Sequence, residues 1–186
     1  MERPAKLKGQ ARGSALLEFA IVLPLLVVFI VGIYDFSGAY NQKQKIEHAA
    51  QAGAIVAGGQ PRSDMYTGNV NPDSLQPVLA VVFNSLASNG VLPLANQGTC
   101  SATSPAFVGN SGLIWTYGIN GCPDSLTIVI DRGVVVAGPL ATVGTTVTVS
   151  YPYHWRFNSV IQLLVPGASY AATTDLRETA TVHNQM

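Results

Sequence analysis

The chain has 186 residues, ten basic and ten acidic side chains, and a formal net charge of zero. Charged residues make up 11% of it and hydrophobic residues 48%, whereas ordinary soluble domains carry about 25% charged residues. Four basic side chains and one acidic lie within residues 1–13, which leaves six basic and nine acidic beyond them. No basic patch remains there, so nucleic acid is excluded as a partner.

The N-terminal region joins this basic leader to a long apolar run. Residues 19–33 are fifteen uncharged residues in succession, and the stretch from Ser14 to Tyr34 holds Glu18 as its single charge. These twenty-one residues form about 31 Å of helix, which is enough to span a bilayer. Because basic flanks stay in the cytoplasm, we expect a cytoplasmic N-terminus and an extracytoplasmic chain after Asp35.

Glu18 is unusual at the edge of this run. A carboxylate facing hydrocarbon costs about 3 kcal/mol, and less near the interface. If a peptidase cuts between Gly13 and Ser14, the new amino group of Ser14 lies four residues before Glu18 on the same helical face. That amine is positively charged near neutral pH, so cleavage would supply the missing cation.

The apolar pattern continues beyond the membrane run at steps near three and four. Its members are Phe36, Tyr40, Ile46, Ala50, Ala54 and Ala57. We therefore expect one helix over residues 14–57, about 66 Å long, ended by Gly58-Gly59 and Pro61. Pro24 removes one backbone donor within this helix. It either kinks the helix or is tolerated there, as prolines are in membrane helices.

The sequence GSALLEFAIVLPLLVVFIVGIYDFSGAYNQKQKIEHAAQAGA, which begins at Gly13 and has Phe19 directly after Glu18, resembles a type IV prepilin processing site. Over its whole length it is similar to the TadE-like minor pseudopilins of tight-adherence (Tad/Flp, type IVc) pili. The C-terminal part of the sequence also resembles this family, with three segments in the same order as in the family: VTVSYPY from Val147, the hydrophobic residues 160–165, and Leu176-Arg177-Glu178.

This resemblance implies a function in assembly or priming of the pilus. Ser14 becomes the mature N-terminus, and Glu18 neutralises that amine or a neighbouring subunit's amine during docking. The implied partners are a prepilin peptidase, other minor pseudopilins, the major pilin, the inner-membrane assembly platform and membrane lipid. The protein would be single-pass in the bacterial inner membrane, and either stays there or enters the surface pilus.

Residues 58–186 are long enough for one further domain. Asp73-Ser74 precedes an apolar periodicity and predicts a capped amphipathic helix that ends near Gly90. Beyond it the pattern predicts β-strands at residues 113–118, 126–131, 133–138, 145–151 and 169–183.

Asp131-Arg132-Gly133 predicts a tight hairpin between two of these strands, and residues 158–165 a short helix or loop. The fold class is therefore α+β, in which a long N-terminal helix and a covering helix lie against an antiparallel sheet. We divide the chain into a leader (1–13), a transmembrane and extended helix (14–57) and an extracytoplasmic domain (58–186).

Cys100 and Cys122 are the only cysteines. An isolated pair outside the cytoplasm predicts a disulfide, which contributes about 3 kcal/mol by loop entropy. The alternatives are metal binding and redox chemistry. Neither fits, because the chain has no CxxC motif and its three histidines are scattered.

No catalytic set appears in the sequence: there is no nucleophile elbow, HExxH, P-loop or GxGxxG after a strand. Tyr151, Tyr153, His154 and Trp155 form the one candidate contact patch, either an aromatic cluster at a sheet edge or loop tip, or a surface that binds a sugar or a partner. We predict no catalytic residue, no cofactor and no metal site. The alternatives to a pilin-like subunit are an uncleaved signal-anchored binding protein and a tethered extracytoplasmic enzyme.

Overall fold

The computed structural model describes residues 10–66, 69, 71–92, 100, 106–136, 142–157, 162, 167 and 173–185, with side chains left out for 10–13 and 106–111. The chain divides into two compact units. The anchor unit comprises residues 1–38 and 155–172, and the sheet unit comprises residues 39–154 and 173–186. These units group residues by packing, and the domain boundaries drawn from the sequence stay a prediction.

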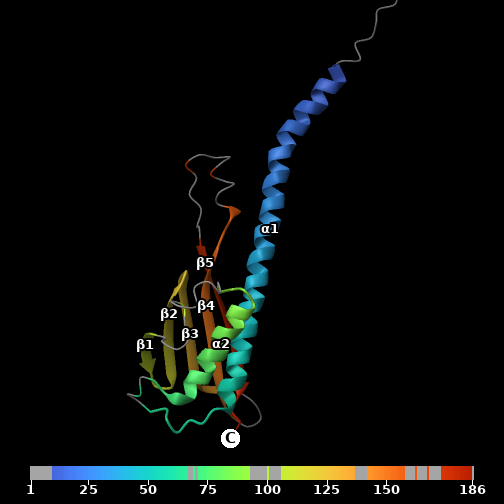
Figure 1. Ribbon diagram of the computed structural model, residues 1–186. Coiled ribbons are helices and arrows are strands. Elements are labelled where there is room, and N and C mark those ends of the chain that lie inside the picture. The colour runs from blue at the N-terminus through green and yellow to red at the C-terminus, as the bar shows by residue number, and fades with distance from the viewer. Residues whose placement is uncertain are drawn as a thin grey trace, which may run out of the picture. The chain divides into compact units, whose positions relative to one another are not determined.

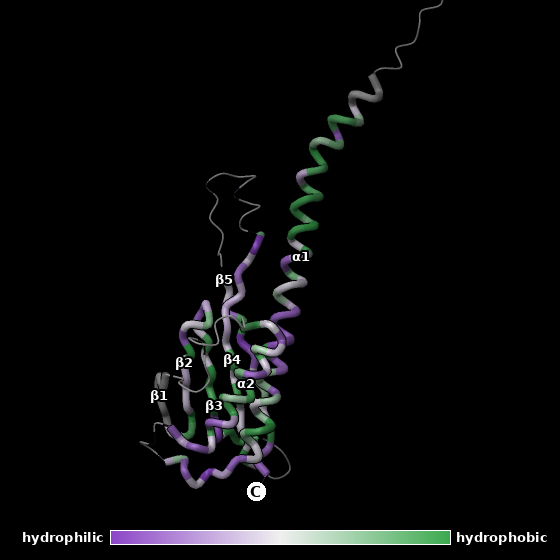
Figure 2. The backbone as a smooth tube through the Cα atoms, in the orientation of Figure 1, coloured by the Kyte–Doolittle hydropathy of each residue, from purple (hydrophilic) through white to green (hydrophobic). Residues whose placement is uncertain are grey.

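Helix α1 (Gln10–Gly59) is one helix of 50 residues with Pro24 inside it. Residues 19–33 of this helix are all uncharged and mostly apolar, and the green stretch of α1 in Figure 2 lies in this part. Such a surface suits lipid, because a helix that is hydrophobic all round is not a surface helix of a soluble domain. The helix ends at the Gly58-Gly59 pair, which confirms the stop signal expected from the sequence.

The sheet unit contains five antiparallel strands in the order β1-β2-β3-β4-β5. They are β1 (Ala106–Ser111), β2 (Ile114–Cys122), β3 (Asp124–Val136), β4 (Thr142–His154) and β5 (Thr173–His183). Neighbours in the sequence are neighbours in the sheet, so the strands form a meander. Within this unit, α2 (Gln76–Ser88) and the C-terminal part of α1 lie on one face of the sheet (Figure 1). The predicted α+β class is confirmed.

The core of the sheet unit lies between that face and the two helices. The register aligns Tyr117, Ile128 and Val149 in one row across three strands, and Trp115, Ile130 and Val147 in the next. All six side chains are buried. The opposite face carries threonines, which pair across β4 and β5: Thr146 with Thr181 and Thr148 with Thr179, each at 2.9 Å between hydroxyls. The alternation thus separates a buried face from a polar one.

Small residues allow α1 to approach the sheet and α2 closely. The buried positions of α1 in this unit are Ala39, Ile46, Ala49, Ala50, Gly53, Ala54, Ala57 and Gly58. Phe36 and Tyr40, expected on the same stripe, are instead exposed. A Cβ atom at Gly53 would lie 2.5 Å from Cγ2 of Val82 and 3.3 Å from Cγ1 of Val147, so glycine is required where α1, α2 and β4 meet.

The hairpin predicted at Asp131-Arg132-Gly133 is wrong, because β3 continues through these residues to Val136. The register with β4 shifts between Asp131 and Val134, which marks an irregularity and not a turn. Arg132 is fully buried, and its backbone N–H donates to the carbonyl of Leu113 at 2.9 Å. A bulge of this kind re-aims a side chain while the strand continues.

Arg132 uses that orientation to bind the backbone beyond the end of α1. Its guanidinium donates to the carbonyl oxygens of Gln60 at 2.8 Å and Pro61 at 3.3 Å. The backbone N–H of Gln185 donates to the carbonyl of Gly58 at 3.0 Å. The last carbonyls of a helix need such donors, and a cation there also favours the helix dipole. Arg132 and Gln185 therefore supply hydrogen-bond donors at and just beyond the end of α1.

The predicted helix near residues 73–90 is present as a 3₁₀ turn (Asp73–Leu75) followed by α2. Its apolar residues Val78, Leu79, Val82, Phe83 and Leu86 are all buried, as the pattern predicts. The cap differs from the prediction, because no side chain of the turn caps it. Instead the carboxylate of Asp64 accepts hydrogen bonds from the backbone N–H and the hydroxyl of Ser74, both at 2.8 Å.

Strand β1 was not among the predicted strands. The sequence signal that would have found it is Gly112, which has a positive φ of 65° in the turn to β2. The strands predicted at 126–131 and 133–138 are one strand, described as far as Val136. β5 covers the described part of the predicted 169–183 strand, and the prediction for 158–165 lies outside the described residues apart from Gln162.

Gly53→Ala should destabilise the sheet unit by about 1–3 kcal/mol, because an added methyl group in a closely packed interior forces shifts of its neighbours. Gly59→Ala is the matched control, since a Cβ there meets nothing within 4 Å. Thermal unfolding of detergent-solubilised protein, followed by circular dichroism, measures both. Equal stability of the two variants would contradict the close approach at Gly53.

Asp64 should make the sheet unit acid-sensitive. Burial raises the pKa of Asp64, but the hydrogen bonds from Ser74 and the charge of Arg132 outweigh it and hold the pKa below its ordinary value of 3.8. A lowered folded-state pKa gives stability that is present above the unfolded value and lost as pH falls through the folded one. Asp64→Asn should flatten the profile of unfolding free energy against pH between about pH 5 and pH 2.

Candidate functional site: the anchor helix and its attachments

The sequence placed a processing site at Gly13, Ser14, Glu18 and Phe19, and all four lie within α1. The hydroxyl of Ser14 donates to a carboxylate oxygen of Glu18 at 3.1 Å. This contact places the two side chains on one face of the helix, as a spacing of four residues requires. Glu18 and Phe19 are exposed, so the carboxylate is accessible to a group from outside the chain.

The surface of α1 around this site is apolar and uncovered. Exposed large hydrophobic side chains extend along it from Leu16 to Tyr40. Among the described residues, one helix is long and apolar enough to cross a membrane, and none of its most apolar window is buried inside the protein. Water is an unfavourable neighbour for such a surface. Lipid or other apolar helices would remove it from water.

Asp35 is an acidic residue of α1 at the other end of the apolar run from Glu18. It is 1% exposed, and its carboxylate accepts a hydrogen bond of 2.7 Å from the backbone N–H of Phe157. Beside it, the ring of Phe36 meets that of Trp155 edge to face, with centroids 5.3 Å apart. The sequence analysis used Asp35 only as the end of the span. The partners lie more than a hundred residues away, so no local pattern could reveal them.

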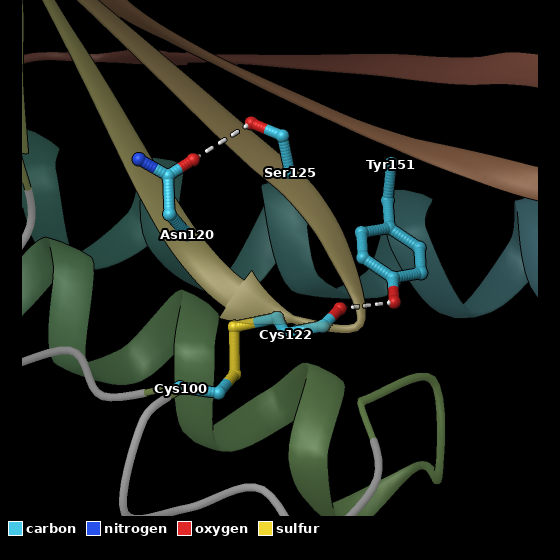
Figure 3. Close-up of a disulfide and its surroundings, with 5 residues drawn as sticks. All are labelled: Cys100, Asn120, Cys122, Ser125 and Tyr151. Carbon is cyan, nitrogen blue, oxygen red and sulfur yellow. Dashed lines mark hydrogen bonds between the residues drawn. A yellow bond between two sulfur atoms is a disulfide. The ribbon is translucent and has the colours of Figure 1, made fainter.

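The disulfide between Cys100 and Cys122 is present, as the sequence predicts. Figure 3 shows it at the end of β2, where the carbonyl of Cys122 also accepts the hydroxyl of Tyr151 at 2.7 Å. Both cysteines are buried. Burial and the charge of Asp124 raise the pKa of Tyr151, so its hydroxyl remains a donor at neutral pH. The disulfide thus joins Cys100 to β2, and the hydrogen bond of Tyr151 joins β4 to the same residue of β2.

The four residues of the predicted contact patch differ in burial and belong to two different units. Tyr151 is buried in the core, with its hydroxyl on Cys122. His154 is exposed, and its Nε2 lies 2.7 Å from Oδ2 of Asp124. Trp155 belongs to the anchor unit and contacts Phe36, while Tyr153 is half-buried in the sheet unit. Alternation along β4 turns successive side chains to opposite faces, which separates residues that are adjacent in the sequence.

Charged side chains of the sheet unit form isolated pairs. Lys43 of α1 and Glu178 of β5 make an ion pair of 3.3 Å, which is partly exposed and so contributes little to stability. Within the part of the chain that the structure describes, no three His, Cys, Asp or Glu side chains come together as metal ligands would. The chemistry of the described site is thus that of an apolar helix with carboxylates at its two ends.

Comparison with protein families matches residues 13–54 to the family described as TadE-like protein. The match begins at Gly13 and covers the apolar half of α1 together with much of its small-residue stripe. It confirms the resemblance to TadE-like proteins of the Tad pilus system that this segment shows. Comparison with curated proteins and with solved structures gives no match.

Residues 13–54 are thus similar to a family of pilin-like proteins associated with the Tad pilus. TadE-like proteins are structural components of the pilus and are not known as enzymes. The apolar helix in the same segment has the length and composition of a single-pass membrane anchor. The matched segment is in keeping with association with other components of the Tad pilus.

Proposed function

We propose that this protein is a minor pseudopilin that a prepilin peptidase cuts between Gly13 and Ser14, and that takes part in assembling or priming a tight-adherence pilus. It acts by assembly and not by catalysis. Its N-terminus lies in the cytoplasm and its sheet unit outside the inner membrane. The observation that carries this proposal is the contact of Ser14 with Glu18 within a TadE-like segment that begins at Gly13.

The charge on the new N-terminus explains why a carboxylate is retained at this position. After cleavage, the amino group of Ser14 would be positively charged near neutral pH. Glu18 lies one helical turn further along the same face, within reach of that amine or of the same amine of a neighbouring subunit. In a bundle of apolar helices an unpaired charge costs several kcal/mol. Pairing therefore favours subunits that have been cut and correctly docked.

Glycine at the cut site also suits the peptidase. The described helix begins at Gln10 and runs through the Gly13-Ser14 bond, and a protease needs its substrate locally extended to reach the carbonyl. Glycine weakens a helix interior by about 1 kcal/mol relative to alanine. Gly13 therefore lowers the free energy of opening this turn, and its small size leaves room in a narrow pocket of the enzyme.

The partners proposed for the protein follow from these surfaces. The peptidase binds the N-terminal turn, and the apolar face of α1 packs first against membrane lipid and later against the helices of other minor pseudopilins and the major pilin. The inner-membrane platform would receive the same helix. An uncleaved signal-anchored binding protein is the competing function. N-terminal sequencing of membrane-extracted protein separates the two, because the proposed function requires Ser14 at the N-terminus and the alternative requires Met1.

Gly13→Leu should leave the leader attached, because a branched side chain fills the space that the peptidase needs before the cut. Gly32→Leu is the matched control: it adds the same side chain to the same helix, at a position where a Cβ meets nothing within 4 Å. Mass spectrometry of the membrane fraction distinguishes precursor from mature chain. Mature mass in Gly13→Leu would show that the cut lies elsewhere.

Glu18→Ala should be inserted and cut normally but fail to support pili. Loss of one carboxylate changes insertion by only a few kcal/mol, in the favourable direction, and leaves Gly13-Ser14 intact. Glu18→Asp, which keeps the charge, should retain part of the piliation. Glu47→Ala serves as the control, since Glu47 is an exposed carboxylate of the same helix, and its carboxylate accepts a hydrogen bond from the neighbouring side chain of Gln51.

The comparison needs a strain that lacks the native copy, with membrane level, mature mass and surface pili measured for every variant. Normal piliation by Glu18→Ala would remove the proposed assembly role of the carboxylate. Failure of Glu18→Ala to be cut would instead assign Glu18 to recognition by the peptidase.

A further inference from the structure

The strongest unexplained feature of the anchor unit is the attachment of residues 155–157 to α1. Asp35 follows Glu18 by seventeen residues, which is about 25 Å of helix. The hydrocarbon core of a bilayer is about 30 Å thick. If Glu18 lies at one edge of that core, Asp35 lies at the other edge, in or next to the headgroup region.

Two interactions of different kinds hold the segment there. The carboxylate of Asp35 accepts the backbone N–H of Phe157 at 2.7 Å, and the ring of Phe36 packs edge to face on Trp155. A backbone N–H near hydrocarbon needs an acceptor, and a carboxylate at the same depth needs a donor. Each group therefore satisfies the other, and the pair would be stabilised where water is scarce.

The aromatic and basic residues near Asp35 are of the kinds that favour a membrane interface. Tyr34 and Phe36 are exposed on α1, Trp155 is half-buried, and Arg156 is exposed. Aromatic rings and arginine at one depth form the belt by which membrane proteins contact the headgroup region. The belt continues directly from the apolar run that lies in the membrane, so lipid is its natural neighbour.

We infer that Trp155-Arg156-Phe157, fastened to α1 at Asp35 and Phe36, form a lipid-contacting segment on the side of the bilayer opposite Glu18. Residues 155–157 would thus contact the membrane at a second point of the chain, in addition to α1 itself. This inference rests on the membrane anchoring in the proposed function, but not on cleavage by the peptidase or on pilus assembly.

The chain contains two tryptophans, which allows a direct test. Trp115 is buried in the sheet unit, with its indole N–H on the carbonyl of Asn69 at 3.1 Å, and Trp155 lies in the proposed segment. The full chain is reconstituted in phosphatidylethanolamine and phosphatidylglycerol vesicles that contain lipid with a doxyl quencher near the headgroup or deep in the acyl chain. Tryptophan emission is then compared with that in unlabelled vesicles.

The shallow quencher should remove a large part of the wild-type emission, and the deep quencher less. Trp155→Phe leaves Trp115 as the only emitter and should lose this quenching. Trp115→Phe, with Trp155 alone, should show it more strongly; if Trp115→Phe does not fold, the difference between wild type and Trp155→Phe gives the same quantity. Equal quenching of wild type and Trp155→Phe would overturn the inference.

Two variants of Asp35 test the attachment itself. Asp35→Asn keeps an acceptor for the N–H of Phe157 and should retain most of the shallow quenching. Asp35→Leu removes the acceptor without adding a charge and should reduce it. In a third outcome, the shallow quencher has no effect in vesicles that hold little protein, and the emission of Trp155 shifts as the amount of protein per vesicle rises. This outcome would assign the segment to contact with a second copy of the chain and would refute contact with lipid. A chain that is never cut can still pass this test, so its outcome is independent of that proposed step.

Discussion

A single helix meets two different environments along its length, and the rest of the molecule depends on how α1 satisfies both. From Phe19 to Ile33 all its residues are uncharged, which leaves no polar face there and suits lipid or other apolar helices. From Ala39 onward it presents a stripe of small residues to a sheet and a second helix. The backbone hydrogen bonds of the helix are internal in both parts, so one element can serve in both environments.

The carboxylates at the two ends of the apolar run differ in how they are satisfied. Asp35 is buried and accepts a backbone N–H from the same chain, so its partner is fixed by the fold. Glu18 is exposed and contacts the hydroxyl of Ser14, which is a neutral donor. The first carboxylate therefore organises the chain internally. The second remains able to bind a cation, which in the proposed function is the new N-terminal amine.

The sheet unit shows how distant segments complete what local sequence leaves unfinished. Arg132 of β3 and the backbone of Gln185 supply donors near the end of α1, while Asp64 supplies the acceptor at the start of α2. The disulfide fixes Cys100 against the end of β2. The hydrogen bonds among these contacts satisfy backbone groups and a carboxylate through residues that are distant in the sequence.

The sequence by itself determined the elements whose causes are local. Apolar residues at helical spacing defined α1 and α2, the glycine pair defined the end of α1, and alternation defined most of the strands. The segment from Gly13 also carried enough pattern to indicate the family. The cysteine pair predicted the disulfide because no other partner exists for either residue in the chain.

Only the tertiary structure decided the contacts between residues far apart in the chain. Asp131-Arg132-Gly133 has the composition of a turn, yet the strand continues, because a buried Arg132 finds two carbonyls about seventy residues away. The aromatic residues 151–155 are close together in the sequence, but only the structure shows that Tyr151 is buried in the core and that Trp155 packs on Phe36. Asp35 shows the same limit, since a hydrogen bond to a residue 122 positions later leaves no trace in local periodicity.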